Sequence, residues 1–236
     1  MFEFEKNCLR DSTDYEDYEL VYRFRESVKN NNTFLHIEDH GAGSRVFKSN
    51  DREVRKILQH NSSSIKMSKL LYRVARYFEV ERVLELGTSL GVATHAFSIA
   101  NETIQVTSVE ASKEIADFTC KNLQSHGVEN VDIVKGNFSK YLNGKLTKKP
   151  SATYDLIYMD GHHDGKATLE YFEQLLPYSH ADTVIVLDDI YWSKDMFAAW
   201  QKLTNHHRVT ASVDIFDLGF LFLRKEQRQQ LFHILV

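Results

Sequence analysis

Five short apolar runs alternate with longer segments of helical periodicity between Arg82 and His206, and this alternation constrains the fold most strongly. The runs are RVLEL (82–86), IQVTSVE (104–110), VDIVKG (131–136), YDLIYMD (154–160) and DTVIVLDD (182–189). Each is followed by a segment of helical period, such as SKEIADFTCKNLQSHG (112–127). Strands that alternate with helices predict an α/β fold with a doubly wound parallel sheet and helices on both faces.

Two further strand-like runs follow the last helical segment. They are VTASVDIFD (209–217) and GFLFLRK (219–225), with only Leu218 between them. A connection this short cannot hold a crossover helix, so we expect an antiparallel hairpin at the edge of the sheet. The whole sheet should then have seven strands.

The N-terminal quarter of the chain has a different character. It is rich in charged residues and has a helix-like pattern, with turn-rich breaks at IEDHGAGSR (37–45) and HNSSS (60–64). We expect residues 1–61 to form a helical cap or lid, and residues 62–236 to form the main domain. Asp39, His40 and Arg45 surround a glycine pair that could belong to the lid, although a helix-capping turn is the alternative interpretation of GAGS.

Composition excludes several functional classes. The chain of 236 residues is 42% hydrophobic and carries a net charge of −4, so it can bury one substantial core and offers no basic surface for nucleic acid. Its cysteines, Cys8 and Cys120, make no disulfide framework or C-x-x-C pair, which favours a cytoplasmic protein. No apolar run approaches the roughly 18 residues of a membrane span. A homodimer is compatible with the sequence.

Chemistry-bearing residues follow the predicted strands. In sheets of this kind, ligands bind beyond the carboxyl ends of the strands, near the point where the winding reverses. The residues at these ends are Glu85 and Gly87, Glu110, Asn137, Asp160, and the pair Asp188 and Asp189. The sequence therefore predicts a site along this edge.

Gly87 and Gly91 bracket the turn after the first of these strands. Glycine tolerates positive φ and lacks Cβ, so a ligand can lie against the backbone, and the helix that follows favours an anionic group at its N-terminus. A turn needed only for packing is the alternative. The nicotinamide dinucleotide fingerprint G-x-G-x-x-G is absent.

Glu110 and Asn137 end the next two strands. An acid at the tip of the second strand can accept hydrogen bonds from two ribose hydroxyls, and a solvated residue is the alternative. Asn137 and Phe138 could bind the edge and face of an adenine, or serve as a helix cap and a core residue.

Asp160, Asp188 and Asp189 should converge, because adjacent parallel strands finish side by side. Uncompensated carboxylates repel one another, so a cation is expected among them. Oxygen ligands suit Mg²⁺, with Ca²⁺ and Mn²⁺ as alternatives. The competing interpretation is that one aspartate caps a helix and another faces solvent. His162 and His163 beside them are either functional or ordinary loop residues.

Five segments together resemble a known family. ELGTSLGVAT, SVEAS, KGNF, YDLIYMDGHHD and VIVLDDIYW resemble the class I S-adenosylmethionine-dependent methyltransferases. They are similar in particular to the catechol and caffeoyl-coenzyme A O-methyltransferases and to the related group with D-G-x-H after the fourth strand. The resemblance covers about residues 62–224 and implies a Rossmann-like fold.

The resemblance implies a role for each matching residue. It places Glu85, Gly87, Thr88 and Gly91 around the methionine moiety of S-adenosylmethionine, Glu110 at its ribose and Asn137 at its adenine, with Asp160 at the edge of the same site. It also assigns Asp160, Asp188 and Asp189 to a divalent metal, although the last of these positions is often Asn in the family.

The catalytic base is where the chain departs from the catechol-type pattern. A lysine stands three residues after the fourth-strand aspartate in those enzymes, and His163 occupies that position here. His163 is therefore the candidate base, with Lys166 in reserve. Tyr191 and Trp192 follow the aspartate pair and either wall a flat substrate or belong to the core.

The function implied is metal-assisted O-methylation of a small hydroxylated molecule. Two alternatives stay open at this point. One is a non-catalytic S-adenosylmethionine-binding protein with a regulatory or interaction role, and the other is a nicotinamide-dependent oxidoreductase on a similar sheet.

Overall fold

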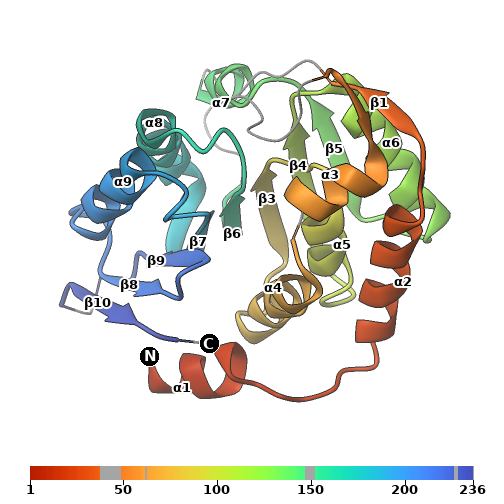
Figure 1. The fold of residues 1–236 in the computed structure, drawn as a ribbon. Coiled ribbons are helices and arrows are strands. Elements are labelled where there is room, and N and C mark those ends of the chain that lie inside the picture. The colour runs from red at the N-terminus through yellow and green to blue at the C-terminus, as the bar shows by residue number, and fades with distance from the viewer. Residues whose placement is uncertain (38–48, 62, 147–151, 226–227, 236) are drawn as a thin grey trace.

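One eight-stranded sheet forms the centre of the protein (Figure 1). The computed structural model describes residues 1–37, 49–61, 63–146, 152–225 and 228–235. The strand order is β10-β8-β9-β7-β6-β3-β4-β5. The strands are β3 (Arg82–Leu86), β4 (Gln105–Glu110), β5 (Val131–Lys135), β6 (Tyr154–Met159), β7 (Ser179–Asp188), β8 (Ala211–Asp214), β9 (Leu218–Phe222) and β10 (Gln230–His233).

Strands β3 to β7 are parallel, and β9 is antiparallel to both β7 and β8. The predicted α/β class and the C-terminal hairpin are therefore confirmed. The chain runs outward from β3 to β4 and β5, and then returns to β6 and β7 on the other side of β3. The winding thus reverses between β3 and β6, where ligands of such sheets bind.

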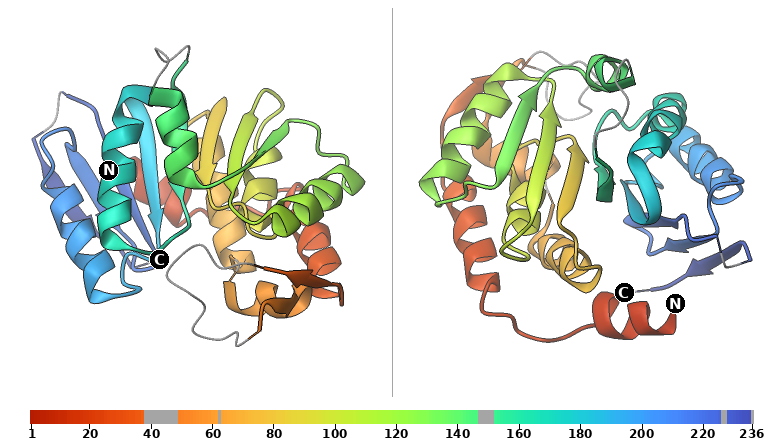
Figure 2. Two further views of the ribbon diagram at one scale, coloured as in Figure 1. Left: turned by 90° about the horizontal axis from the view of Figure 1, so that it is seen from above. Right: turned by 180° about the vertical axis from the view of Figure 1, so that it is seen from behind.

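The sheet has one strand more than the seven predicted. β10 pairs in parallel with β8, from Gln230 opposite Ala211 to His233 opposite Asp214. Its side chains are mostly exposed, so its sequence shows no alternation of apolar and polar residues that would mark a strand. The N-terminus lies beside the C-terminal segment (Figure 2), where Arg10 Nη2 donates a hydrogen bond to the Leu235 carbonyl oxygen at 2.6 Å.

Helices cover both faces of the sheet (Figure 2). They are α4 (Ile65–Tyr77), α5 (Val92–Ser98), α6 (Lys113–Ser125), α7 (Phe138–Leu146), α8 (Gly165–Leu175), the 3₁₀ turn η2 (Leu176–Tyr178) and α9 (Lys194–Thr204). Four of them begin where a side chain caps the N-terminus by accepting the backbone N–H three residues later, at Ser64, Ser112, Asp164 and Ser193. Capping thus sets where each helix starts relative to the strand before it.

The central strands are buried on both sides, which explains their continuous apolar runs. On β6, Leu156 and Tyr158 pack in one core cluster with residues of α4 and α5. The alternate residues Ile157 and Met159 pack in a second cluster with residues of α8 and α9.

The N-terminal region combines helices with a small sheet. Its elements are α1 (Phe2–Phe4), the π-helical turn η1 (Glu5–Leu9), α2 (Tyr18–Lys29), β1 (Phe34–His36), β2 (Asp51–Glu53) and α3 (Val54–Asn61). Strands β1 and β2 are antiparallel, so this region is not wholly helical. Phe4, Cys8 and Tyr18 pack in the same cluster as residues of β3 and β6. A domain boundary after residue 61 stays a prediction.

Asp39, His40, Arg45 and the GAGS turn lie outside the described residues. Within the part of the chain that the structure describes, no helix is long and apolar enough to cross a membrane.

Candidate active site

The turn from β3 into α5 needs glycine at two positions. Gly87 has φ +109°, and a Cβ there would lie 1.8 Å from the Asp160 carbonyl oxygen. Gly91 has φ +77°, and its Cβ would lie 2.5 Å from Thr119 Cγ2. Packing alone therefore accounts for both glycines. The same geometry also brings the backbone after β3 against the end of β6, at the reversal of the winding.

Glu85 is a buried acid held by hydroxyl groups beneath this turn. Its Oε2 accepts hydrogen bonds from Thr94 Oγ1 and Ser108 Oγ, each at 2.5 Å, and Thr88 Oγ1 lies 2.6 Å from the same serine hydroxyl. Among the described residues, Glu85 Oε1 has no hydrogen-bond partner although it is buried. Burial raises the pKa of Glu85 to about 8.

Glu110, at the tip of β4, is fixed by backbone groups. Its Oε2 accepts the N–H of Ser89 at 3.0 Å, and its Oε1 accepts the N–H of Ser112 at 2.8 Å. Ser89 lies in the glycine turn and Ser112 caps α6, so two loops hold one carboxylate. The side chain is 9% exposed and has a fixed orientation at the strand end.

Asn137 begins the segment after β5 as a helix cap. Its Oδ1 accepts the N–H of Ser139 at 2.9 Å. The ring of Phe138 lies against Gly161, where a Cβ would be 2.7 Å from it. Both residues therefore have structural partners at the edge of the site, and a role in binding adenine stays a prediction.

The structure brings Asp160, Asp188 and Asp189 together at the ends of β6 and β7. Burial raises the pKa of Asp160 to about 7; a hydrogen bond with Asp188 opposes this rise, whereas the charge of Asp189 adds to it. The pKa of Asp188 is well above its ordinary value, because of burial and the charges of both other aspartates. The pKa of Asp189 is also raised, again mainly by burial. These acids repel one another as the sequence predicted.

The arrangement of side chains leaves the metal prediction open. Within the described residues, no group of three or more His, Cys, Asp or Glu side chains is arranged so that it could hold a metal ion. Asp160 is mostly buried, with 18% of its side chain exposed, whereas Asp189 is 44% exposed. The oxygens themselves are of the kind that hard cations prefer.

His163 lies between two of the acids. Its Nε2 is 3.7 Å from Asp160 Oδ1, and its Nδ1 is 3.8 Å from Asp189 Oδ2. Lys166, the reserve base, has 86% of its side chain exposed, and its Nζ lies 3.9 Å from Glu170 Oε1. His162 instead contacts Tyr171, with its Nδ1 2.9 Å from the phenol oxygen.

Aromatic rings flank the acidic residues. Trp192 lies beside His163, with ring centroids 5.5 Å apart, and is 40% exposed. Tyr191 stacks between Phe197 and Phe216, at centroid distances of 5.0 and 5.2 Å. Tyr191 and Trp192 are thus partly exposed rings and not core residues.

Sequence reasoning missed several residues of this region. Phe216, 64% exposed at φ +76°, comes from the β8–β9 turn, and its N–H is held by the buried Asp214. Tyr158, fully buried, donates a hydrogen bond to Asp160 Oδ2 at 3.4 Å. The period of two along a strand could have identified Tyr158, because residues 158 and 160 point to the same face.

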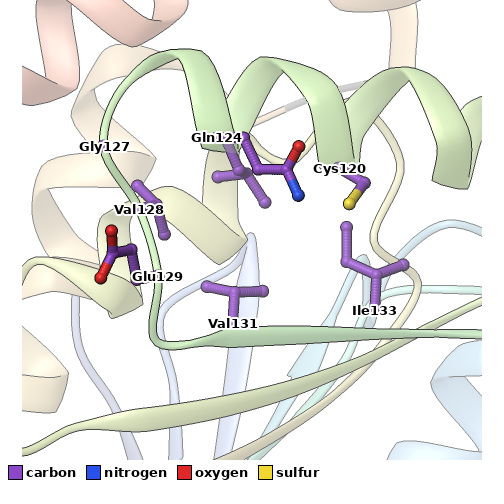
Figure 3. Close-up of a pocket in the computed structure, with 8 residues that line it drawn as sticks. Cys120, Gln124, Gly127, Val128, Glu129, Val131 and Ile133 are labelled. Carbon is purple, nitrogen blue, oxygen red and sulfur yellow. The ribbon is translucent and has the colours of Figure 1, made fainter.

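A cleft lies between α6 and β5 (Figure 3). It has a volume of about 310 Å³ and is lined by Cys120, Gln124, Val128 and Ile133, among others. It contains none of the strand-end acids.

The central part of the chain is similar to a known protein family. Residues 84–190 match a family described as a methyltransferase domain. The protein-L-isoaspartate O-methyltransferase 1 of Archaeoglobus fulgidus is 39% identical over 82 residues, which are 34% of this chain and 35% of the relative. The corresponding enzyme of Pyrococcus abyssi is 33% identical over 91 residues, 39% of each chain. The chain thus spans little more than a third of the length of these curated relatives.

Solved structures share the fold over nearly the whole chain. A methyltransferase of Podospora anserina, solved with S-adenosylhomocysteine bound, has a TM-score of 0.68 at 16% identity and covers 95% of each chain. The O-methyltransferase TomG of Streptomyces achromogenes, in complex with S-adenosylmethionine, has a TM-score of 0.64 at 17% identity and covers 95% of this chain and 100% of its own. At identities of 16–17%, this structural similarity establishes a shared fold and nothing more.

These findings confirm the resemblance drawn from the motifs. The match covers the glycine turn, Glu110 and all three aspartates, and the fold extends beyond it in both directions. Residues 84–190 are therefore similar to a methyltransferase domain, within a chain whose fold matches those of solved methyltransferases.

Proposed function

We propose that the chain is an S-adenosylmethionine-dependent O-methyltransferase of a small hydroxylated molecule. One observation carries the proposal: Glu110 is fixed beside the glycine turn on one side of the winding reversal, and three aspartates with His163 lie on the other side. A cofactor bound along the first side would present its methyl group toward the second.

Features of this chain suit S-adenosylmethionine. The buried Glu85 Oε1 lacks a partner among the described residues and can accept a hydrogen bond from a cationic group such as the cofactor's ammonium. Glu110 would hold the ribose, with Gly87, Thr88 and Gly91 around the methionine part, Asn137 near the adenine and Asp160 at the edge. When bound, the cofactor supplies an electrophilic methyl group with a neutral leaving group.

The carboxylates would also suit a divalent cation. Asp160, Asp188 and Asp189 offer hard oxygen donors, and burial, the largest cause, raises the pKa of all three carboxyl groups. We infer that these three residues hold Mg²⁺, or Ca²⁺ or Mn²⁺ in its place. Such an ion would lower the pKa of the acceptor hydroxyl and orient it.

The remaining steps fall to the chain's own side chains. His163 accepts the proton of the acceptor hydroxyl, and Asp160 and Asp189 stabilise the imidazolium that results, because both lie within 4 Å of its ring nitrogens. Lys166 is the reserve for this role. Tyr191 and Trp192 would wall the acceptor and help to exclude water, which favours a reaction in which charge is neutralised.

The test is formation of S-adenosylhomocysteine from S-adenosylmethionine with catechol as the probe acceptor. We expect turnover with Mg²⁺ and its loss when EDTA removes the metal. Turnover that persists in EDTA would contradict the metal assignment alone. Turnover only with a peptide that contains L-isoaspartate, the substrate class named for the curated relatives, would contradict the small-molecule assignment. No turnover with any of a panel of phenols, alcohols and this peptide would contradict the catalytic proposal.

A further inference from the structure

Tyr158 is a buried phenol inside the acidic region. It lies on β6 two residues before Asp160, is completely buried, and packs edge-to-face on Phe97 with ring centroids 5.5 Å apart. Its hydroxyl donates a hydrogen bond to Asp160 Oδ2 at 3.4 Å. An apolar ring would usually fill a core position of this kind, so the presence of a hydroxyl group there calls for an explanation.

The hydroxyl lies among acids: Asp160 accepts its hydrogen bond, and Asp188 and Glu85 are close enough to interact with it electrostatically. A neutral phenol is a hydrogen-bond donor, which is what a group of carboxylates lacks. Ser63 also forms a hydrogen bond with Tyr158, and it immediately precedes the capping residue of α4. The phenol therefore connects the acidic region with the residues that begin α4.

The two oxygens of Asp160 have different partners. Oδ2 accepts from Tyr158 on the core side, and Oδ1 lies 3.7 Å from His163 Nε2 on the open side. Asp188 also forms a hydrogen bond with this carboxyl group, so Tyr158 is one of two groups that hold it. A carboxylate that is held by one oxygen cannot rotate freely, so its other oxygen has a fixed direction. An imidazole takes its orientation and tautomer from the acceptor beside it.

We propose that Tyr158 is a positioning residue for His163, acting through Asp160. The phenol fixes the rotation of the Asp160 carboxylate, and the carboxylate in turn fixes the orientation of the imidazole. This inference rests on the proposed function only in taking His163 as the base. It assigns Tyr158 no contact with the reacting atoms.

The test compares two matched variants of the full chain by NMR of the histidine ring nitrogens. Tyr158→Phe removes the proposed link. Tyr72→Phe removes another buried phenol that donates to a carboxylate, Asp17 Oδ2 at 2.6 Å, with no part in the acidic region. His163→Gln assigns the His163 signals. We expect these signals to shift in Tyr158→Phe and to stay in place in Tyr72→Phe.

Unchanged His163 signals in a folded Tyr158→Phe protein would overturn the proposal. If that variant does not fold, Asp160→Asn tests the link from its middle: the ring signals of both Tyr158 and His163 should shift. Movement of only one would contradict the link. Binding of S-adenosylhomocysteine to the unaltered protein is measured in parallel, so that a failure of the methyltransferase proposal is recognised separately.

Discussion

The carboxyl ends of β3 and β4 differ from those of β6 and β7 in how their acids are satisfied. Glu85 and Glu110 accept hydrogen bonds from hydroxyl and backbone N–H groups. Asp160 and Asp188 instead hydrogen-bond each other and repel Asp189, with His163 at ion-pair distance. The first region thus holds its carboxyl groups with neutral donors in fixed orientations, whereas the carboxyl groups of the second region face one another, the kind of environment in which perturbed pKa values occur.

Gly87 joins the two regions. Its backbone passes so close to the Asp160 carbonyl oxygen that no side chain fits between them. The Asp160 N–H donates to the Leu86 carbonyl oxygen at 2.9 Å, which closes the same contact from the other direction. A change on one side can therefore be tested for its effect on the other.

The largest effect is expected from Asp188→Ala. It removes an acid of the second region only, so turnover should fall about 10²- to 10⁴-fold, the range for loss of a group that acts in proton transfer or charge stabilisation. Binding of S-adenosylhomocysteine should be retained. Asp182→Ala is the control, because this exposed aspartate lies on the same strand, β7, six residues before Asp188 and outside the acidic region. Equal loss of binding and turnover in Asp188→Ala would mean that the acids only support the fold.

Gly87→Ala tests the contact between the regions. Positive φ alone costs about 1–2 kcal/mol, and the overlap with backbone should bring the total loss of unfolding free energy to about 3 kcal/mol or more. Gly127→Ala is matched, because Gly127 has φ +73° and nothing within 4 Å of an added Cβ. Urea denaturation measures both variants. Equal losses would show that the close approach does not constrain the protein.

Glu85→Gln tests the buried acid of the first region through pH. The pKa of Glu85 rises from 4.5 to about 8 on folding, so the folded state keeps a proton that the unfolded state loses in that interval. Stability should therefore fall as pH rises, by about 1.4 kcal/mol per unit within that window. The variant cannot lose this proton, so its advantage over the unaltered protein should grow from about pH 5 to about pH 8. A constant difference between the two proteins over that range would contradict the buried, protonated state.

Glu110→Gln should produce the smallest of these effects. A carboxylate that accepts from two ribose hydroxyls is worth about 1.5–3 kcal/mol over a neutral acceptor, or roughly 10- to 100-fold in affinity. Calorimetry with S-adenosylhomocysteine measures the loss. Glu114→Gln, at an exposed acid in the first turn of α6, is the control. An unaltered affinity in Glu110→Gln would remove the ribose assignment.

The residues at the strand ends could be predicted from the sequence. The residues that other parts of the chain bring to the site could not. Alternation and glycine spacing predicted β3 to β7 and the convergence of Asp160, Asp188 and Asp189, because parallel strands of known order end side by side. Phe216 and Asp214 come from a hairpin whose placement depends on tertiary packing. Tyr158 resembles any apolar strand residue until its hydroxyl is seen against a carboxylate. The strand β10 was missed because its exposed side chains carry no pattern.

Titration of S-adenosylhomocysteine into the protein by calorimetry tests the central claim most directly, with NAD as the control ligand. The account predicts saturable binding of S-adenosylhomocysteine with one site per chain and no binding of NAD. Absence of S-adenosylhomocysteine binding, or preference for NAD, would contradict it.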